Sequence, residues 1–340
     1  MRVPRLGLRQ LAHRTARRIS GRRLVLTYHR VTRQQHDPWA LTVAPERFEE
    51  QLSVLRKHCV VISLQRMLHD LRAGTLARNA VAVTFDDGYA DNLHAAIPIL
   101  ERHEVPATFF LSPGLLDGKS SFWWDELGRI LLRGHPLPDR LELDVAGRMF
   151  RWNRPGPGVA PPPSPDTWRG WQPTTDPAKE LYLDLWRILK PLRRETQLRL
   201  LAELRAWSGV LAPTATDDRS LTLEEAARLA HHPLAEIGAH TLSHPTLPAH
   251  DGATKRAEIA GSKRACEDIA GRAVASFSYP YGDLDAETVS LVRDAGFGTA
   301  FTTESRPVRL RHQPQHLPRI QMHDWTGAQF ERALLTRELW

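Results

Sequence analysis

Two adjacent carboxylates, Asp86 and Asp87, follow the apolar run Val81–Phe85 and precede Gly88. Consecutive side chains at a strand end point in different directions, so one carboxylate can bind a metal ion while its neighbour activates a water molecule beside it. A bound dication would also offset the repulsion between two buried carboxylates. A solvated Asp-Asp-Gly turn uses the same residue types, so the metal interpretation requires further ligands from elsewhere in the chain.

A histidine pair supplies ligands of the required type. His240 and His244 directly follow the segment Ala235–Ala239, which has the character of a buried strand. Their spacing alone is weak evidence in a chain with 16 His, but their position at a predicted strand end is stronger. Two imidazoles and one carboxylate leave coordination positions open, which suits a catalytic zinc or another divalent metal.

A third segment, Phe277–Gly282, ends another apolar run and reads Phe-Ser-Tyr-Pro-Tyr-Gly. An ordinary turn would use these residues. A turn at a strand end also positions backbone amides, so the Tyr281 N–H is a candidate donor to a developing oxyanion.

Taken in order, these segments resemble the motifs of the polysaccharide deacetylase family, the NodB homology domain of carbohydrate esterases. Thr84–Gly88 looks like the first motif, His240–Pro245 like the second and Pro280–Gly282 like the third. The resemblance implies a distorted (β/α) barrel with fewer than eight complete units, a divalent metal, and hydrolysis of N-acetyl groups from amino sugars. In addition, Leu26–Val31 is similar to a segment of the subgroup that acts on exopolysaccharides.

Carried over residue by residue, the resemblance implies that Asp86 is the general base and that Asp87, His240 and His244 bind the metal. Zinc is the preferred metal, with cobalt or nickel as alternatives. The same resemblance gives the Tyr281 backbone N–H the role of holding the tetrahedral oxyanion.

The chain departs from the family pattern at Ser278, where the third motif usually opens with an arginine that orients the base. Arg319, on the last predicted strand, is a candidate replacement, although an arginine at the surface or paired with a helix is an equal alternative. The family also uses a late histidine as general acid. His323 is the first candidate for this role, His316 is the competitor, and a protonation route without a histidine is the remaining alternative.

Alternating strands and helices must position these residues. The predicted strands span residues 24–28, 60–62, 81–85, 107–111, 235–239, 275–279 and 299–302. One predicted helix begins at Pro45, and four others span residues 64–71, 92–102, 254–270 and 287–295. This order favours an α/β protein with a mostly parallel sheet and its loops at one end. With the resemblance, we expect a distorted (β/α)7-type barrel.

The domain organisation predicted from the sequence is a basic tail at 1–23 and a single deacetylase domain at 24–335. Regular alternation breaks at about 119–220, where a proline-rich stretch precedes two helical segments at 180–190 and 195–208. We interpret this region as an insertion into the domain. Its Trp123 and Trp124 are candidates for stacking on sugar rings, with core packing as the alternative.

Charge and composition limit the partners. The net charge of +7 comes mostly from arginines spread along the chain, and no nucleic-acid-binding motif accompanies it, so nucleic acid is not an expected partner. No apolar run is long enough for a membrane span. We expect a cytoplasmic protein, with peripheral contact of residues 1–23 to the inner membrane as an open alternative.

The expected function is therefore metal-dependent removal of N-acetyl groups from a polysaccharide or a lipid-linked glycan. Hydrolysis of a non-sugar amide or an O-acetyl ester is an alternative, because nothing in these motifs recognises the sugar ring. A non-catalytic glycan-binding protein is another, since the orienting arginine of the third motif is missing at Ser278.

Overall fold

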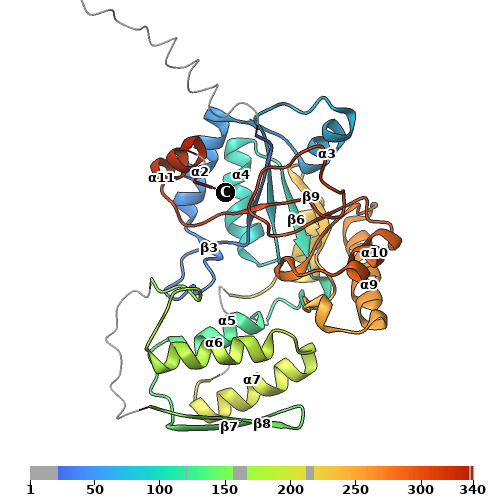
Figure 1. The fold of residues 1–340 in the computed structure, drawn as a ribbon. Coiled ribbons are helices and arrows are strands. Elements are labelled where there is room, and N and C mark those ends of the chain that lie inside the picture. The colour runs from blue at the N-terminus through green and yellow to red at the C-terminus, as the bar shows by residue number, and fades with distance from the viewer. Residues whose placement is uncertain (1–21, 120, 156–166, 212–217, 337, 340) are drawn as a thin grey trace, which may run out of the picture.

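A parallel β-sheet forms the centre of the computed structural model, which describes residues 22–119, 121–155, 167–211, 218–336 and 338–339 (Figure 1). The strands follow the spatial order β11 (Thr299–Phe301), β10 (Ser276–Ser278), β9 (Ala235–Ala239), β6 (Ala107–Leu111), β5 (Ala80–Phe85), β1 (Leu24–Tyr28) and β12 (Ile320–Gln321). A short strand, β4 (Val60–Val61), also pairs with β5. Every pairing in this sheet is parallel, as the alternating sequence pattern predicted.

The two edges of the sheet approach each other through one segment near the C-terminus. Leu317 forms a parallel bridge with Phe301 of β11, and Ile320 of β12 pairs with Leu26 of β1. Residues 317–321 therefore form a seam between the first and last strands. The sheet curls into a distorted barrel of the (β/α)7 type, which confirms the predicted fold class.

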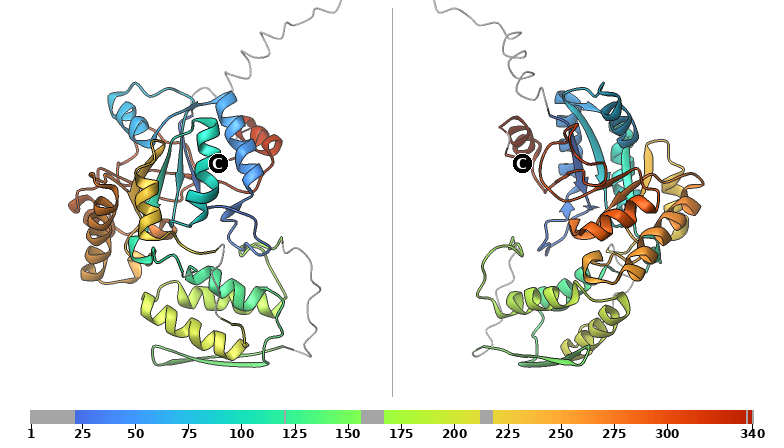
Figure 2. Two further views of the ribbon diagram at one scale, coloured as in Figure 1. Left: turned by 180° about the vertical axis from the view of Figure 1, so that it is seen from behind. Right: turned by 45° about the vertical axis from the view of Figure 1, so that its right-hand side comes forward.

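Helices surround the sheet in Figures 1 and 2. They are α2 (Pro45–His58), α3 (Leu64–Ala73), α4 (Ile97–His103), α8 (Leu223–Ala230), α9 (Gly252–Ala270), α10 (Ala286–Asp294) and α11 (Gly327–Thr336). Local signals fix several of their ends: Ser63 caps α3, and Thr222 forms a capping box with Glu225 at α8. The helix predicted at 92–102 begins instead as a π-helix, Asn92–Ala96, where Asn92 Nδ2 donates to the His29 carbonyl at 2.8 Å.

The main core lies between the central strands and the helices that cover them. Residues of β1, β5 and β6 are buried throughout, and Phe85 stacks on Phe109 with ring centroids 4.9 Å apart. Each such side chain contributes about 1.5–3 kcal/mol by leaving water. This packing fixes the strands whose ends carry the polar site.

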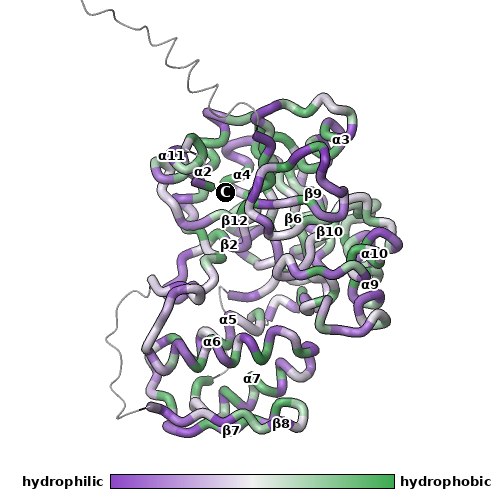
Figure 3. The backbone as a smooth tube through the Cα atoms, in the orientation of Figure 1, coloured by the Kyte–Doolittle hydropathy of each residue, from purple (hydrophilic) through white to green (hydrophobic). Residues whose placement is uncertain are grey.

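The residues between β6 and β9, where the insertion was predicted, form a second layer. It contains α5 (Trp123–Leu132), the hairpin β7 (Arg140–Val145) and β8 (Arg148–Asn153), α6 (Pro177–Leu189) and α7 (Arg194–Ser208). These elements have their own hydrophobic cluster. Hydrophobic and hydrophilic residues alternate along α6 and α7 in Figure 3, as expected of amphipathic helices.

The insertion differs from expectation in one element, the β7–β8 hairpin, which was not predicted. Its signal is present: Leu141 and Leu143 alternate with exposed residues, and Ala146 and Gly147 form a turn with positive φ. Residues 156–166, most of the proline-rich stretch, lie outside the described residues, as do residues 1–21 of the basic tail. No helix in the described part of the chain is long and apolar enough to cross a membrane.

Candidate metal and catalytic site

The site lies at the carboxyl ends of the central strands. Asp86 and Asp87 follow the last residue of β5, and His240 follows the last residue of β9. Ser278 is the last residue of β10. Parallel strands bring their carboxyl ends to one edge of a sheet, so segments about 150–190 residues apart in sequence converge here.

The three proposed metal ligands form one buried cluster. Asp87 Oδ1 lies 3.3 Å from His244 Nε2 and 3.5 Å from His240 Nε2. One ligand atom from each of the three residues lies within 4.8 Å of the other two. His240 Nδ1 donates to the Ser278 carbonyl at 2.8 Å, so its Nε2 is left to face the cluster as a lone-pair donor.

The electrostatics of this cluster favour a cation. Burial alone would raise the pKa of Asp87, but hydrogen bonds with His240 and His244 hold it well below its usual range. Burial alone would lower the pKa of His240, yet the charges of Asp86 and Asp87 raise it. Two adjacent carboxylates therefore draw positive charge to this position. The donor set, its burial and its charge all fit a divalent metal.

The loops that carry the ligands adopt unusual backbone conformations. Asp87, Thr241, His244 and Tyr281 have φ values of 76°, 65°, 57° and 60°. They are four of the seven non-glycine residues with positive φ in the described ranges. Such conformations cost of order 1–3 kcal/mol each and persist where the surroundings enforce them. Their concentration at one site indicates that the ligand geometry, not local preference, determines the backbone here.

A carboxylate from α9 holds the histidine loop in place. Glu258 Oε2 accepts from the backbone N–H groups of Leu242 and Ser243 at 2.8 and 2.9 Å, and its Oε1 accepts from Ser243 Oγ at 2.6 Å. Sequence reasoning missed Glu258, because it lies on the helix after the motif and no local pattern marks it. It is a positioning residue for His240 and His244.

Arg319 makes the contact with Asp86 that an orienting arginine requires. Its Nη1 and Nη2 donate to Asp86 Oδ1 and Oδ2 at 2.7 and 2.6 Å. Ser278 Oγ donates to Asp86 Oδ2 at 3.1 Å and accepts from Arg319 Nη2 at 2.7 Å. Arg319 is 0% exposed, so the surface alternative is wrong. The guanidinium thus reaches the base from the seam, while the small Ser278 leaves room for it on β10.

This pairing sets the charge state of Asp86. Burial would raise the pKa of Asp86, but the Arg319 charge, His240 and the Arg319 hydrogen bonds together lower it. Asp86 is therefore an ionised carboxylate held in one orientation by a two-pronged ion pair. A carboxylate of this kind can accept a proton from a neighbouring water molecule.

The candidate acids occupy different positions. His316 Nε2 pairs with Glu304 at 2.9 Å, and within the described residues no contact links His316 to Asp86 or to the histidine pair. His323 packs edge-on against Trp325 with ring centroids 5.2 Å apart, and burial lowers the pKa of His323. Burial has the largest effect on the pKa values of Asp86, Asp87 and His323. The charge of His29 is a smaller effect that lowers all three pKa values. His29 therefore lies near Asp86 and Asp87, and His323 lies near His29.

Aromatic residues of the insertion line the other side of the cluster. Trp124 contacts the His244 ring with centroids 4.8 Å apart, and Tyr281 contacts it at 4.6 Å. Trp123 Nε1 donates to Tyr281 Oη at 3.1 Å. Both tryptophans are buried, so the packing alternative holds for their rings in this structure. They join the insertion to the metal ligands.

A buried ionic network behind these rings was not anticipated from the sequence. Arg30 pairs with Asp91 at 3.0 Å and with Asp218 at 2.8 Å. Its guanidinium lies 4.4 Å from the Tyr89 ring centroid, and Tyr89 Oη donates to Asp125 Oδ2 at 2.7 Å. The residues of this network are far apart in sequence, so no local pattern predicts their contacts. Only Asp125, at the polar end of the Phe-Trp-Trp-Asp run, stood out in the sequence.

Fold and site together define an α/β barrel protein with a candidate metal site at the carboxyl ends of its strands. The family model described as polysaccharide deacetylase matches residues 73–138 and 210–300, which flank the insertion and contain Asp86, Asp87, His240, His244 and Tyr281. The chain belongs to the polysaccharide deacetylase family.

Solved structures share this fold along most of the chain. The Streptococcus pyogenes deacetylase PplD in complex with acetate is 15% identical, with a TM-score of 0.58 over 93% of this chain and 99% of its own. IcaB from Ammonifex degensii is 17% identical, with a TM-score of 0.56 over 93% and 97%. The de-N-acetylase from Aggregatibacter actinomycetemcomitans is 14% identical, with a TM-score of 0.55 over 92% and 99%. No curated protein sequence gives a significant match.

Proposed function

We propose that this protein is a metal-dependent deacetylase that removes N-acetyl groups from amino sugars of a polysaccharide or a lipid-linked glycan. The observation that carries the proposal is the buried Asp87-His240-His244 cluster beside Asp86, whose orientation Arg319 fixes. Zinc is the proposed metal, with cobalt or nickel as alternatives. The proposal includes a cytoplasmic location, with contact of the basic N-terminus to the inner membrane as its alternative form.

In the proposed reaction, Asp87, His240 and His244 hold the metal. When bound, a divalent metal polarises a carbonyl and lowers the pKa of a water molecule towards neutrality. Asp86 accepts the proton of the attacking water, because it is ionised and fixed by Arg319. The Tyr281 backbone N–H donates to the oxyanion, and His323 delivers the proton to the leaving amine.

The structure bears on the non-catalytic alternative. That alternative rested on the missing arginine of the third motif, whereas Arg319 supplies a bidentate contact to Asp86 from the position just before β12. The base therefore keeps an orienting partner despite Ser278. Hydrolysis of an O-acetyl ester or a non-sugar amide uses the same groups, so the choice of substrates must separate these reactions.

Acetate release is the direct test. Metal-stripped full-length protein should release acetate from N-acetylglucosamine oligomers only after zinc or cobalt is added. O-acetylated and non-sugar amide substrates in parallel assays identify the bond that is cleaved. Absence of metal-dependent release from every substrate would overturn the enzyme proposal, and release from the esters alone would overturn N-deacetylation.

Metal binding should also stabilise the fold. At a metal concentration of about 100 times Kd, binding to the native state alone adds about 2.7 kcal/mol to the free energy of unfolding. We expect zinc to raise the melting temperature of the wild-type protein, and the His244→Ala variant to lose most of this shift. The exposed His69, on α3, provides a matched control: His69→Ala should keep the shift. An equal zinc shift in His244→Ala would exclude His244 as a ligand.

A further inference from the structure

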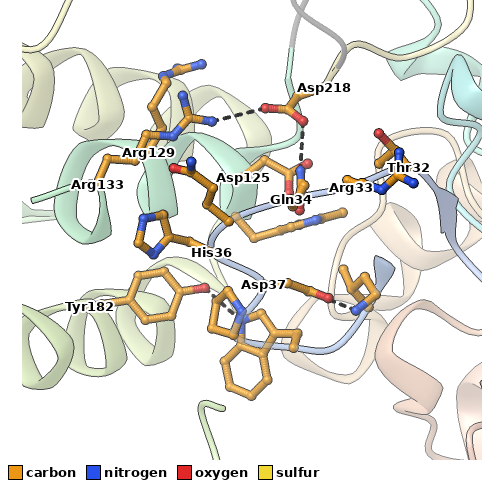
Figure 4. A pocket seen from close by; sticks show the side chains of 16 residues that line it. Thr32, Arg33, Gln34, His36, Asp37, Asp125, Arg129, Arg133, Tyr182 and Asp218 are labelled. Carbon is orange, nitrogen blue, oxygen red and sulfur yellow. Dashed lines mark hydrogen bonds and ion pairs between the residues drawn. The ribbon is translucent and has the colours of Figure 1, made fainter. Parts of the chain in front are cut away.

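A polar pocket of about 470 Å³ opens next to the catalytic site. It lies between the segment 32–41, which joins β2 (Arg30–Val31) to β3 (Thr42–Val43), and the insertion helices α5 and α6. Figure 4 shows its polar lining, in which Arg129 of α5 and Arg133, which directly follows α5, face the segment that carries Gln34 and His36. The pocket is therefore built jointly by the barrel and the insertion.

One side chain connects the pocket to the metal ligands. Trp124 lines the pocket and also contacts the His244 ring, with centroids 4.8 Å apart. Asp125, the next residue, also lines the pocket, and the charge of Asp87 contributes to its pKa. A ligand that fills this pocket thus lies one side chain away from the metal cluster.

Arg129 lines this pocket without a hydrogen-bonded counter-charge, although the charges of Asp218 and Asp125 act on it from a distance. Its side chain is 8% exposed, and its Nε and Nη2 are buried with no hydrogen-bond acceptor within the described part of the chain. The nearest carboxylate oxygen, Glu126 Oε1, is 3.9 Å away and is already in contact with Arg205 Nη1. An uncompensated buried guanidinium is costly, because arginine remains charged at all physiological pH values.

The acidic side chains of the pocket do not accept hydrogen bonds from Arg129, because they are engaged with other groups. Asp218 accepts from Arg30 at 2.8 Å, from Gln34 at 2.7 Å and from Arg133 at 3.4 Å. Asp37 accepts from the backbone N–H groups of Leu41 and Thr42.

Asp125, the third acid of the pocket, accepts from Tyr89 Oη, and burial raises its pKa to about 7, so that it is only partly ionised at neutral pH. None of these three acids therefore accepts a hydrogen bond from Arg129 in the described part of the chain.

We propose that this pocket binds an anionic group of the substrate, a phosphate or a carboxylate on the acetylated saccharide, with Arg129 as its main counter-charge. The proposal rests on the proposed deacetylase function and names its substrate class: an anionic amino sugar or an anionic neighbour of one. The oxyanion supplies the acceptors that Arg129 lacks, and Arg133 adds a second positive charge at the rim. Trp124 separates this anion from the carbonyl that is cleaved.

Binding to metal-free full-length protein tests this inference separately from catalysis. The probes are N-acetylglucosamine, N-acetylglucosamine 1-phosphate and N-acetylmuramic acid, which are neutral, phosphorylated and carboxylated in turn, with inorganic phosphate alone as a fourth. Calorimetry should give a Kd for at least one anionic sugar about 10-fold or more below that of the neutral sugar. The phosphate and carboxylate arms identify which anion is preferred.

The variant Arg129→Gln should remove most of this preference, an increase of about 10-fold in Kd for the anionic sugar. Arg187→Gln on α6 is a matched control, since Arg187 is exposed and pairs with Asp184 on the helix surface. If Arg129→Gln fails to fold, Arg133→Gln at the half-exposed rim replaces it with a smaller expected loss.

Equal affinities for neutral and anionic sugars would overturn the inference, as would the same affinities in Arg129→Gln and Arg187→Gln. Equal acetate release from neutral and anionic substrates would uphold the deacetylase proposal and contradict this one. Conversely, Arg129-dependent anion binding without acetate release from any substrate would uphold the pocket and contradict the enzyme.

Discussion

Replacing Asp86 with asparagine should reduce acetate release by about 10²- to 10⁴-fold, the range that a general base contributes. The amide keeps the shape of the carboxylate but cannot accept the proton of the attacking water. Asp87, His240 and His244 are untouched, so metal content, measured on the purified variant, should remain that of the wild-type protein. Asp87→Asn is the contrasting variant, because it should lose metal affinity together with activity.

The asparagine also removes the counter-charge of buried Arg319, so part of any activity loss could come from unfolding. Assays well below the melting temperature of the variant separate the two effects. A second variant, Asp86→Asn combined with Arg319→Met, removes both charges and should be more stable than Asp86→Asn alone but equally inactive. Near-wild-type turnover in metal-loaded, folded Asp86→Asn would exclude Asp86 as the base.

Replacing Arg319 with methionine should lower the free energy of unfolding of the metal-free protein by about 3–5 kcal/mol, the usual cost of breaking a buried ion pair from one side. Asp86 would remain buried, 3% exposed, with only Ser278 and the histidines near it. Urea unfolding, monitored by circular dichroism, measures the loss. Activity should fall as well, because nothing then fixes the orientation of the Asp86 carboxylate.

The position of Ser278 offers a stringent control for this second prediction. Ser278, at the end of β10, and Arg319, just before β12, both contact Asp86 Oδ2. An arginine introduced at Ser278 in the Arg319→Met background would return the guanidinium to the place that the family motif usually gives it. We expect this double variant to recover part of the stability and activity. Unchanged stability in Arg319→Met itself would show that the ion pair does not stabilise the fold.

The parts of the structure that depend on local sequence could be predicted. The expected strands at 24–28, 107–111 and 235–239 coincide with β1, β6 and β9, because buried parallel strands appear as short apolar runs. The convergence of Asp87 with His240 and His244 was also accessible, since each group follows such a run. Strand ends meet at one edge of a parallel sheet whatever their separation in sequence.

What escaped prediction depends on contacts between distant residues. Arg319 lies 233 positions after Asp86, and the sequence could name it only as one of two alternatives. Glu258 and the Arg30 network have no pattern of their own, because ordinary charged residues acquire these roles only through packing. The positive φ at Asp87 and His244 could not be predicted either: Asp and His adopt it more often than most non-glycine residues, but no local pattern marks these two positions.

The position of the seam, residues 317–321, near the C-terminus determines the order in which the parts of the site can form during synthesis. Domains fold as synthesis proceeds from the N-terminus, and residues 87, 240 and 244 leave the ribosome well before Arg319. A chain at that stage can gather its metal ligands, but Asp86 lacks its ion-pair partner and the barrel lacks its last strand. Closure of the fold and orientation of the base are therefore one late event.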